Sequence, residues 1–119
     1  MPFAEPVPPV SERRRTARRP IEPLSVRLGR NRHGICVDLS ASGALVQLPV
    51  APPTDRQFTA RFEWNDTIVA LQARVMRSVG RAVRLESATL ARTEYSVGLE
   101  FVDPTPKAVG AIQQIMAHD

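Results

Sequence analysis

Hydrophobic and polar residues alternate along most of the chain after residue 23, in short stretches separated by turn-forming residues. A period of two places every second side chain on one face of a β-strand, so each stretch predicts a strand with an apolar face. Asn65-Asp66 lies between two of these stretches and suits a tight hairpin turn. The predicted strands cover residues 24–29, 34–39, 43–48, 57–64, 67–77 and 94–101, with a weaker one near 81–87.

The last part of the chain has a different pattern. Asp103 is a suitable helix cap, and Pro104 fits the first helical turn. The apolar residues that follow recur at roughly helical spacing; they are Val109, Ile112, Ile115 and Met116. A helix is therefore expected over residues 104–117. Six strands and one helix in 119 residues predict a mostly-β fold: a small six-stranded antiparallel β-barrel whose C-terminal α-helix covers an opening or an edge.

The residues before the strands are rich in proline and arginine. We expect residues 1–11, which contain four prolines, to form a disordered N-terminal tail. The rest of the chain, 12–119, is expected to be a single domain. Within it, an arginine-rich arm is expected at 12–23 and the barrel at 24–102.

The basic residues have an unusual composition. Fifteen of the sixteen are arginines, and eight of these lie between Arg13 and Arg32. Guanidinium groups match phosphates and the O6/N7 edge of guanine, and they also stack on flat rings. The bias therefore indicates shaped recognition of an anionic ligand.

Several classes of protein are disfavoured. The chain has no apolar run near the roughly 20 residues of a membrane-spanning helix, and its first residues lack the features of a signal peptide. Cys36 is the only cysteine, so no intramolecular disulfide can form, and a cytoplasmic location without membrane insertion is expected. Cys36 itself is expected in the core.

No catalytic motif is present, and neither His33 nor His118 has further ligands at metal spacing, so we expect no enzyme activity, metal or cofactor.

Two motifs carry the candidate chemistry. The first lies within the arginine run Arg13-Arg14-Arg15-Thr16-Ala17-Arg18-Arg19, and the second is Asp38-Leu39-Ser40-Ala41-Ser42-Gly43, between two predicted strands. Together they resemble the signatures of the PilZ domain family of bacterial cyclic di-GMP receptors, Arg-Arg-x-x-x-Arg followed by Asp/Asn-x-Ser-x-x-Gly. The resemblance extends over residues 12 to about 117, and it implies a barrel that binds this cyclic dinucleotide.

The resemblance also implies roles for the arginines. Equivalent arginines in the family wrap the ligand from one side, and here they are Arg13, Arg14 and Arg18. Glu12 favours this register, because a polar residue often precedes the arginine pair. The register stays open, because the same pattern also fits Arg14, Arg15 and Arg19.

The turn motif has its own expected chemistry. Asp38 can accept hydrogen bonds from guanine N1–H and N2–H₂, and Ser40 adds a short donor or acceptor beside it. Gly43 is expected to take a positive φ that closes the turn. The resemblance implies that Asp38 and Ser40 lie on the barrel surface opposite the arginines, across the ligand.

The expected function is that of a monomeric receptor or adaptor. Its arm would become ordered over cyclic di-GMP and so signal to an unidentified effector protein. Two alternatives stay open: a small barrel that binds nucleic acid through its basic arm, and a PilZ-fold interaction domain without a ligand. An aromatic content of 5% disfavours the first, because single-strand binders usually stack bases on several rings, so we expect no specific nucleic acid partner. The intact motifs disfavour the second.

Overall fold

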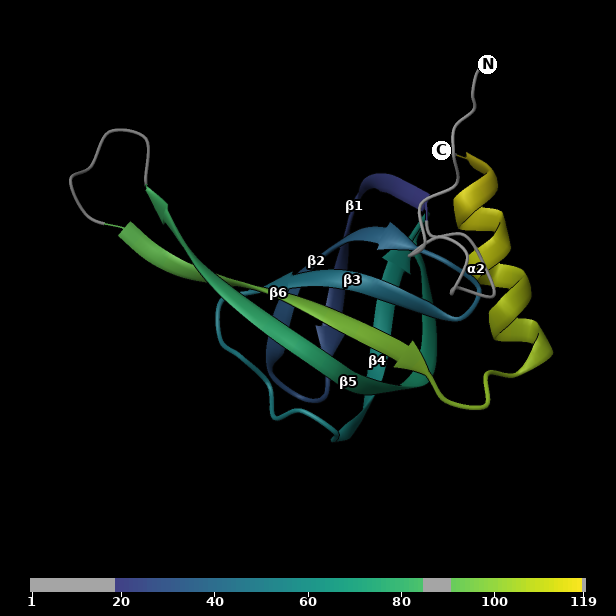
Figure 1. The fold of residues 1–119 in the computed structure, drawn as a ribbon. Helices are drawn as coiled ribbons and strands as arrows, with labels where there is room; N and C mark the ends of the chain where they lie inside the picture. Colours follow the sequence, from purple (N-terminus) through teal and green to yellow (C-terminus); the bar gives the residue numbers. More distant parts are fainter. Residues whose placement is uncertain (1–18, 85–90, 119) are drawn as a thin grey trace, which may run out of the picture.

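The computed structural model describes residues 19–84 and 91–118, which form six strands and one helix (Figure 1). The elements are β1 (Arg19–Leu28), β2 (Arg32–Leu39), β3 (Gly43–Leu48), β4 (Gln57–Trp64), β5 (Thr67–Arg84), β6 (Ala91–Phe101) and α2 (Pro106–His118). All neighbouring strands are antiparallel, and they close into a barrel in the order β1-β2-β3-β6-β5-β4. The predicted fold class is confirmed.

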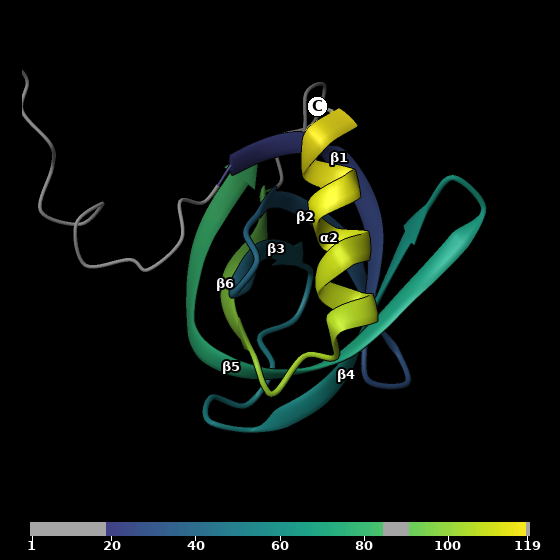
Figure 2. The same ribbon diagram turned by 90° about the vertical axis from the view of Figure 1, so that its right-hand side faces the viewer.

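The barrel is closed by a short contact between β1 and β4, where Val26 lies opposite Phe62. Alternating apolar residues from all six strands point inward and form one buried core. Phe62 and Phe101 meet edge to face there, with ring centroids 6.1 Å apart. Helix α2 lies across one mouth of the barrel (Figure 2), and its Ile112 and Ile115 are fully buried in the same core.

β1 begins five residues earlier than predicted, so residues 19–23 are part of the barrel and not of the arm. Pro20 and Pro23 lie in this added stretch, and proline has no N–H for the ladder. The structure accommodates them in an irregular stretch: the pairing of β1 with β2 shifts register between Pro20 and Leu24. The strand therefore continues through the prolines because a bulge tolerates the missing donors.

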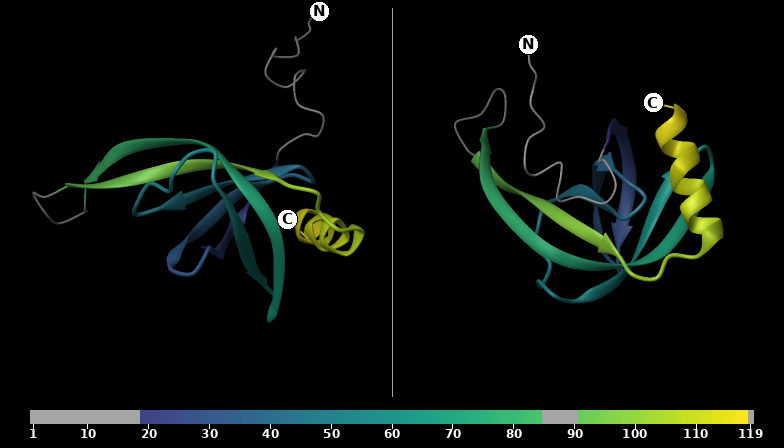
Figure 3. Two further views of the ribbon diagram at one scale, coloured as in Figure 1. Left: turned by 90° about the horizontal axis from the view of Figure 1, so that it is seen from below. Right: turned by 45° about the vertical axis from the view of Figure 1, so that its right-hand side comes forward.

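β5 is also longer than predicted. The predicted strand 67–77 and the weak one near 81–87 form a single element of 18 residues, which pairs with β6 as far as Arg84 and Ala91. The two strands extend beyond the barrel as a twisted ribbon (Figure 3). The turn before β5 is as expected: Asn65 and Asp66 have φ values of 50° and 61°, which suits a two-residue hairpin.

The predicted helix start was two residues too early. Asp103 has a φ of 44° and precedes the helix, which begins at Pro106. The cap is Thr105, whose Oγ1 accepts a hydrogen bond of 3.1 Å from the Ala108 N–H. Thr105-Pro106 repeats the cap-then-proline pattern of Asp103-Pro104, so the sequence offered two equivalent starts. Among the described residues, no helix is long and apolar enough to cross a membrane.

Candidate functional site

The turn between β2 and β3 is organised around the hydroxyl of Ser40. Ser40 Oγ accepts hydrogen bonds from the Ser42 N–H (3.2 Å) and the Gly43 N–H (3.1 Å), and the Ser40 N–H donates to the Gly43 carbonyl (2.9 Å). A serine hydroxyl that satisfies the amides ahead of it is a common way to close a tight turn. Ser40 is only 2% exposed. The turn therefore encloses its hydroxyl, whereas we expected this group to be available to the ligand.

Gly43 does not have the positive φ that we expected; among the described glycines only Gly29 does. The residue is required for a different reason. Gly43 lies opposite Glu100 of β6, and a Cβ on Gly43 would overlap the backbone carbonyl oxygen of Leu99. The glycine therefore allows β3 to approach β6 at the first residue of the strand.

Asp38 is placed by a β-bulge in β2. The register with β3 shifts between Cys36 and Asp38, so Val37 is the extra residue. Strict alternation would bring Asp38 to the same side as Cys36, which is fully buried. With the extra residue, Cys36 and Leu39 both point into the core, while Asp38 is partly exposed.

Cys36 supports this bulge. Its Sγ–H donates to the Asp38 carbonyl oxygen over 3.4 Å. Burial raises the pKa of the Cys36 thiol to about 12, so the side chain is a neutral core residue, as predicted.

The structure also fixes where the chain enters the barrel. On the β1 side, Pro20 lies opposite Asp38 and Arg19 lies opposite Leu39. Arg13, Arg14 and Arg18 are outside the described residues. Arg19 is both the last residue of the arginine run and the first residue of β1, so the run leads in sequence to the strand position beside the turn motif.

A groove of about 260 Å³ lies beside the turn, on the outer surface of β3, β6 and β5. Sequence reasoning missed its β5 side, which is contributed by Met76 and Arg77 at a second bulge. The alternation of apolar and polar residues in this strand breaks after Val75, and this break was the sequence signal for the bulge. Gly98 lies opposite Arg77 in this bulge. The remaining lining residues are Ser42, Gly43, Leu45, Leu99 and Glu100.

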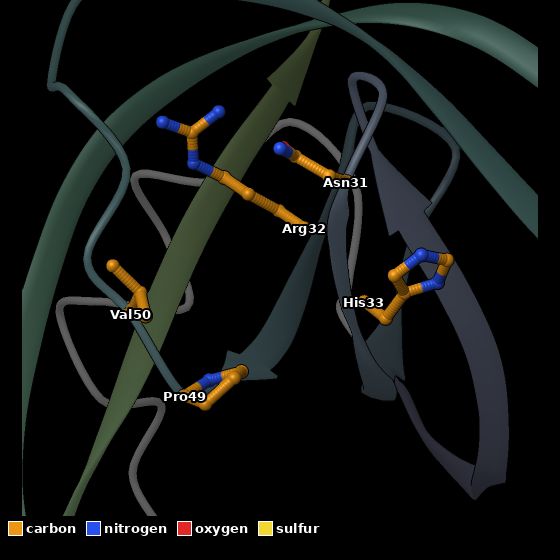
Figure 4. Close-up of a pocket in the computed structure, with 5 residues that line it drawn as sticks. All are labelled: Asn31, Arg32, His33, Pro49 and Val50. Atoms are coloured by element: carbon orange, nitrogen blue, oxygen red, sulfur yellow. The ribbon is translucent and has the colours of Figure 1, made fainter.

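A separate pocket of about 270 Å³ lies at the far end of β3 from the turn (Figure 4). It is lined by Asn31, Arg32, His33, Pro49 and Val50. The Arg32 guanidinium stacks over the Phe58 ring at 5.1 Å, and His33 is exposed, as predicted. This pocket contains no residue of either motif. Across residues 19–84 and 91–118, no three His, Cys, Asp or Glu side chains are grouped to hold a metal ion.

Comparison with known proteins identifies the family to which the chain is similar. A family model described as "PilZ domain" matches residues 12–118. Among solved structures, the PilZ domain of YcgR from Escherichia coli, determined with c-di-GMP, superposes with a TM-score of 0.72 at 18% identity, covering 89% of this chain and 90% of that one. A search of curated proteins finds no match.

Two longer proteins share the same fold. MrkH, a c-di-GMP-dependent transcription regulatory factor, superposes with a TM-score of 0.67 at 13% identity. The inhibitor of motility MotI (DgrA) from Bacillus subtilis gives 0.64 at 15% identity. Each comparison covers 89% of this chain but only 50% of the other protein.

Proposed function

This chain belongs to the PilZ domain family, and we propose that it is a receptor for cyclic di-GMP that passes the signal to a protein partner. The observation that carries the proposal is the position of Asp38. The bulge in β2 turns the partly exposed Asp38 side chain away from the side of Cys36, at the strand position opposite Pro20, where the chain arrives from the arginine run. We propose that the two motifs, about twenty residues apart in sequence, come together at this edge of the barrel when the ligand binds.

Asp38 would read the guanine base. A carboxylate can accept from N1–H and N2–H₂ together, a pair of donors that adenine lacks. Arg13, Arg14 and Arg18 would bind the phosphates and pair with or stack on the guanines, because guanidinium serves all three contacts. The groove beside the turn would extend the contact surface toward Arg77.

Ser40 and Gly43 would act by holding the turn. The buried hydroxyl of Ser40 and the close approach of Gly43 to Leu99 fix the backbone that follows Asp38. Both residues keep their place in the proposed site as positioning residues, and Gly43 also lines the groove beside the turn.

Signalling would follow from ordering of the arm. The ligand's phosphates remove the mutual repulsion among the arginines, so we propose that the segment around Arg13–Arg18 becomes ordered across the turn when cyclic di-GMP binds. The arm and the ligand together would present a new surface to the partner, while the barrel changes little.

Calorimetric titration tests the proposal. We expect cyclic di-GMP to bind at least tenfold more tightly than cyclic di-AMP, and Asp38→Ala to remove most of this difference. Glu63→Ala, which removes an exposed carboxylate from β4, is the matched control and should leave both affinities unchanged. Equal binding of the two dinucleotides by the wild-type protein would contradict the proposed site.

A further inference from the structure

The ribbon formed by the ends of β5 and β6 extends beyond the barrel without support from other strands. β4 pairs with β5 only as far as Arg74, and β3 pairs with β6 only from Tyr95 onward. From Arg81 and Glu94 outward the two strands pair with each other alone, up to Arg84 and Ala91 (Figures 1 and 3). The preceding pair Val79–Ser96 lies at the base of the ribbon, where Ser96 still pairs with Gln47 of β3. A two-stranded hairpin has little stability of its own, so a ribbon of this length gains from a partner.

The two faces of the ribbon differ in chemistry. Directly opposite residues share a face, so the pairs Val79–Ser96, Arg81–Glu94 and Val83–Arg92 define what we call the outer ribbon face. The other face carries the small or uncharged pairs Gly80–Tyr95 and Ala82–Thr93. Between residues 78–83 of β5 and 92–97 of β6, all charged residues are therefore on the outer ribbon face.

The outer ribbon face combines exposed apolar and positively charged groups. Val79 is 56% exposed although valine is a typical core residue, and the exposed Arg81 and Arg92 follow it toward the end of the ribbon on the same face. Glu94 is the only acid on this described face, so the face is net positive. Arginine with exposed aliphatic groups and without lysine is a composition enriched in protein–protein interfaces.

We propose that the outer ribbon face is a docking surface for a protein partner that presents acidic side chains next to apolar ones. The acidic groups would pair with Arg81 and Arg92, and the apolar groups would cover Val79. A second copy of this chain is a poor occupant, because its own arginines would meet those of the first. A single-stranded nucleic acid is also a poor occupant, because the described outer face offers no aromatic ring for base stacking.

The position of this surface links it to the proposed receptor function. Arg77 lines the groove beside the turn, and Val79 follows two residues later on the same strand. A partner on the outer ribbon face would therefore border the ligand groove. This coupling to cyclic di-GMP rests on the proposed function, whereas the docking itself does not.

The test uses the full chain and a defined probe, a seven-residue peptide of alternating glutamate and valine. In an NMR titration at physiological salt, amide shifts should change at residues 78–83 and 92–96. The double variant Arg81→Glu/Arg92→Glu should bind the peptide at least tenfold more weakly. Arg30→Glu/Arg56→Glu makes the same change of charge at exposed sites elsewhere and should stay within twofold of wild type.

Four results would overturn the docking proposal. The first two are amide shifts that map to other residues and an equal loss of peptide affinity in the control variant. The other two are tighter binding of an oligo-dT of equal charge at the same residues, and a wild-type dimer in sedimentation that Val79→Asp dissociates.

Calorimetry with cyclic di-GMP separates the docking proposal from the receptor proposal. The Arg81→Glu/Arg92→Glu variant should retain wild-type ligand affinity, and a wild-type protein that binds the peptide but no dinucleotide would reject only the receptor function.

Discussion

The α-carbon of Gly43 in β3 lies so close to the carbonyl oxygen of Leu99 in β6 that a side chain on Gly43 would overlap it. The carbonyl belongs to a strand backbone and cannot move without disturbing the pairing of β3 with β6. This contact, together with the hydrogen bond from the Gly43 N–H to Ser40 Oγ, fixes where the turn ends and β3 begins.

Gly43→Ala should therefore destabilise the protein by about 1–3 kcal/mol, the usual cost of forcing an extra carbon into a packed site. Gly110→Ala is the matched control, because nothing lies within 4 Å of the added carbon in α2. Alanine is the better helix former, so this variant should gain roughly 0.5–1 kcal/mol. Urea unfolding measures the stability of both variants. A Gly43→Ala variant that is as stable as the wild-type protein would refute the steric account.

Ser40→Ala should destabilise the protein by about 1–3 kcal/mol, because two backbone N–H groups lose their buried acceptor. Cyclic di-GMP affinity should fall as well, through displacement of the turn. The exposed Ser25 gives the control: Ser25→Ala should change stability by less than about 0.5 kcal/mol. Weakened ligand binding with unchanged unfolding would instead make Ser40 a direct ligand contact.

Single alanine variants of the arginine run should resolve its register. Arg14→Ala and Arg18→Ala should each weaken cyclic di-GMP binding by ~1.5–3 kcal/mol, the range for hydrogen bonds to charged groups, and leave thermal unfolding unchanged. Arg13→Ala should weaken binding more than Arg19→Ala does. The reverse order, measured by calorimetry, would assign the site to Arg14, Arg15 and Arg19.

Amide hydrogen exchange should report ordering of the arm. On saturation with cyclic di-GMP, exchange at residues 12–18 should slow, while the strand amides of the barrel change little. Ordering costs on the order of 1–2 kcal/mol per fixed residue, so protection should be confined to a short stretch around Arg13–Arg18. Exchange at 12–18 that is the same with and without ligand would exclude this signalling mechanism.

Much of the fold follows from local pattern. β3 and β4 have the predicted bounds, because strict alternation and flanking turn residues specify a strand without reference to its neighbours. The Asn65-Asp66 hairpin is equally local, since these two residue types tolerate the required positive φ. The helix start was predicted two residues before Pro106, because two cap-and-proline pairs occur in succession and the local pattern does not distinguish them.

The sequence identified candidate residues of the site but not their positions relative to one another. The sequence by itself determined which motifs are present, that Asp38 and Ser40 share a turn, and that arginines precede the first strand. It did not determine the bulge at Val37, the burial of Ser40 or the reason for Gly43. The bulge depends on the register of β2 with β3, and the glycine is required by Leu99 of β6, a strand that is distant in sequence. The ribbon is a further case. The residue pattern of β5 and β6 is similar inside and outside the barrel, and the ends of β3 and β4 determine where their pairing with these two strands stops. Pairing between distant strands fixes register and closest approach, and these quantities are not encoded in any single stretch of residues.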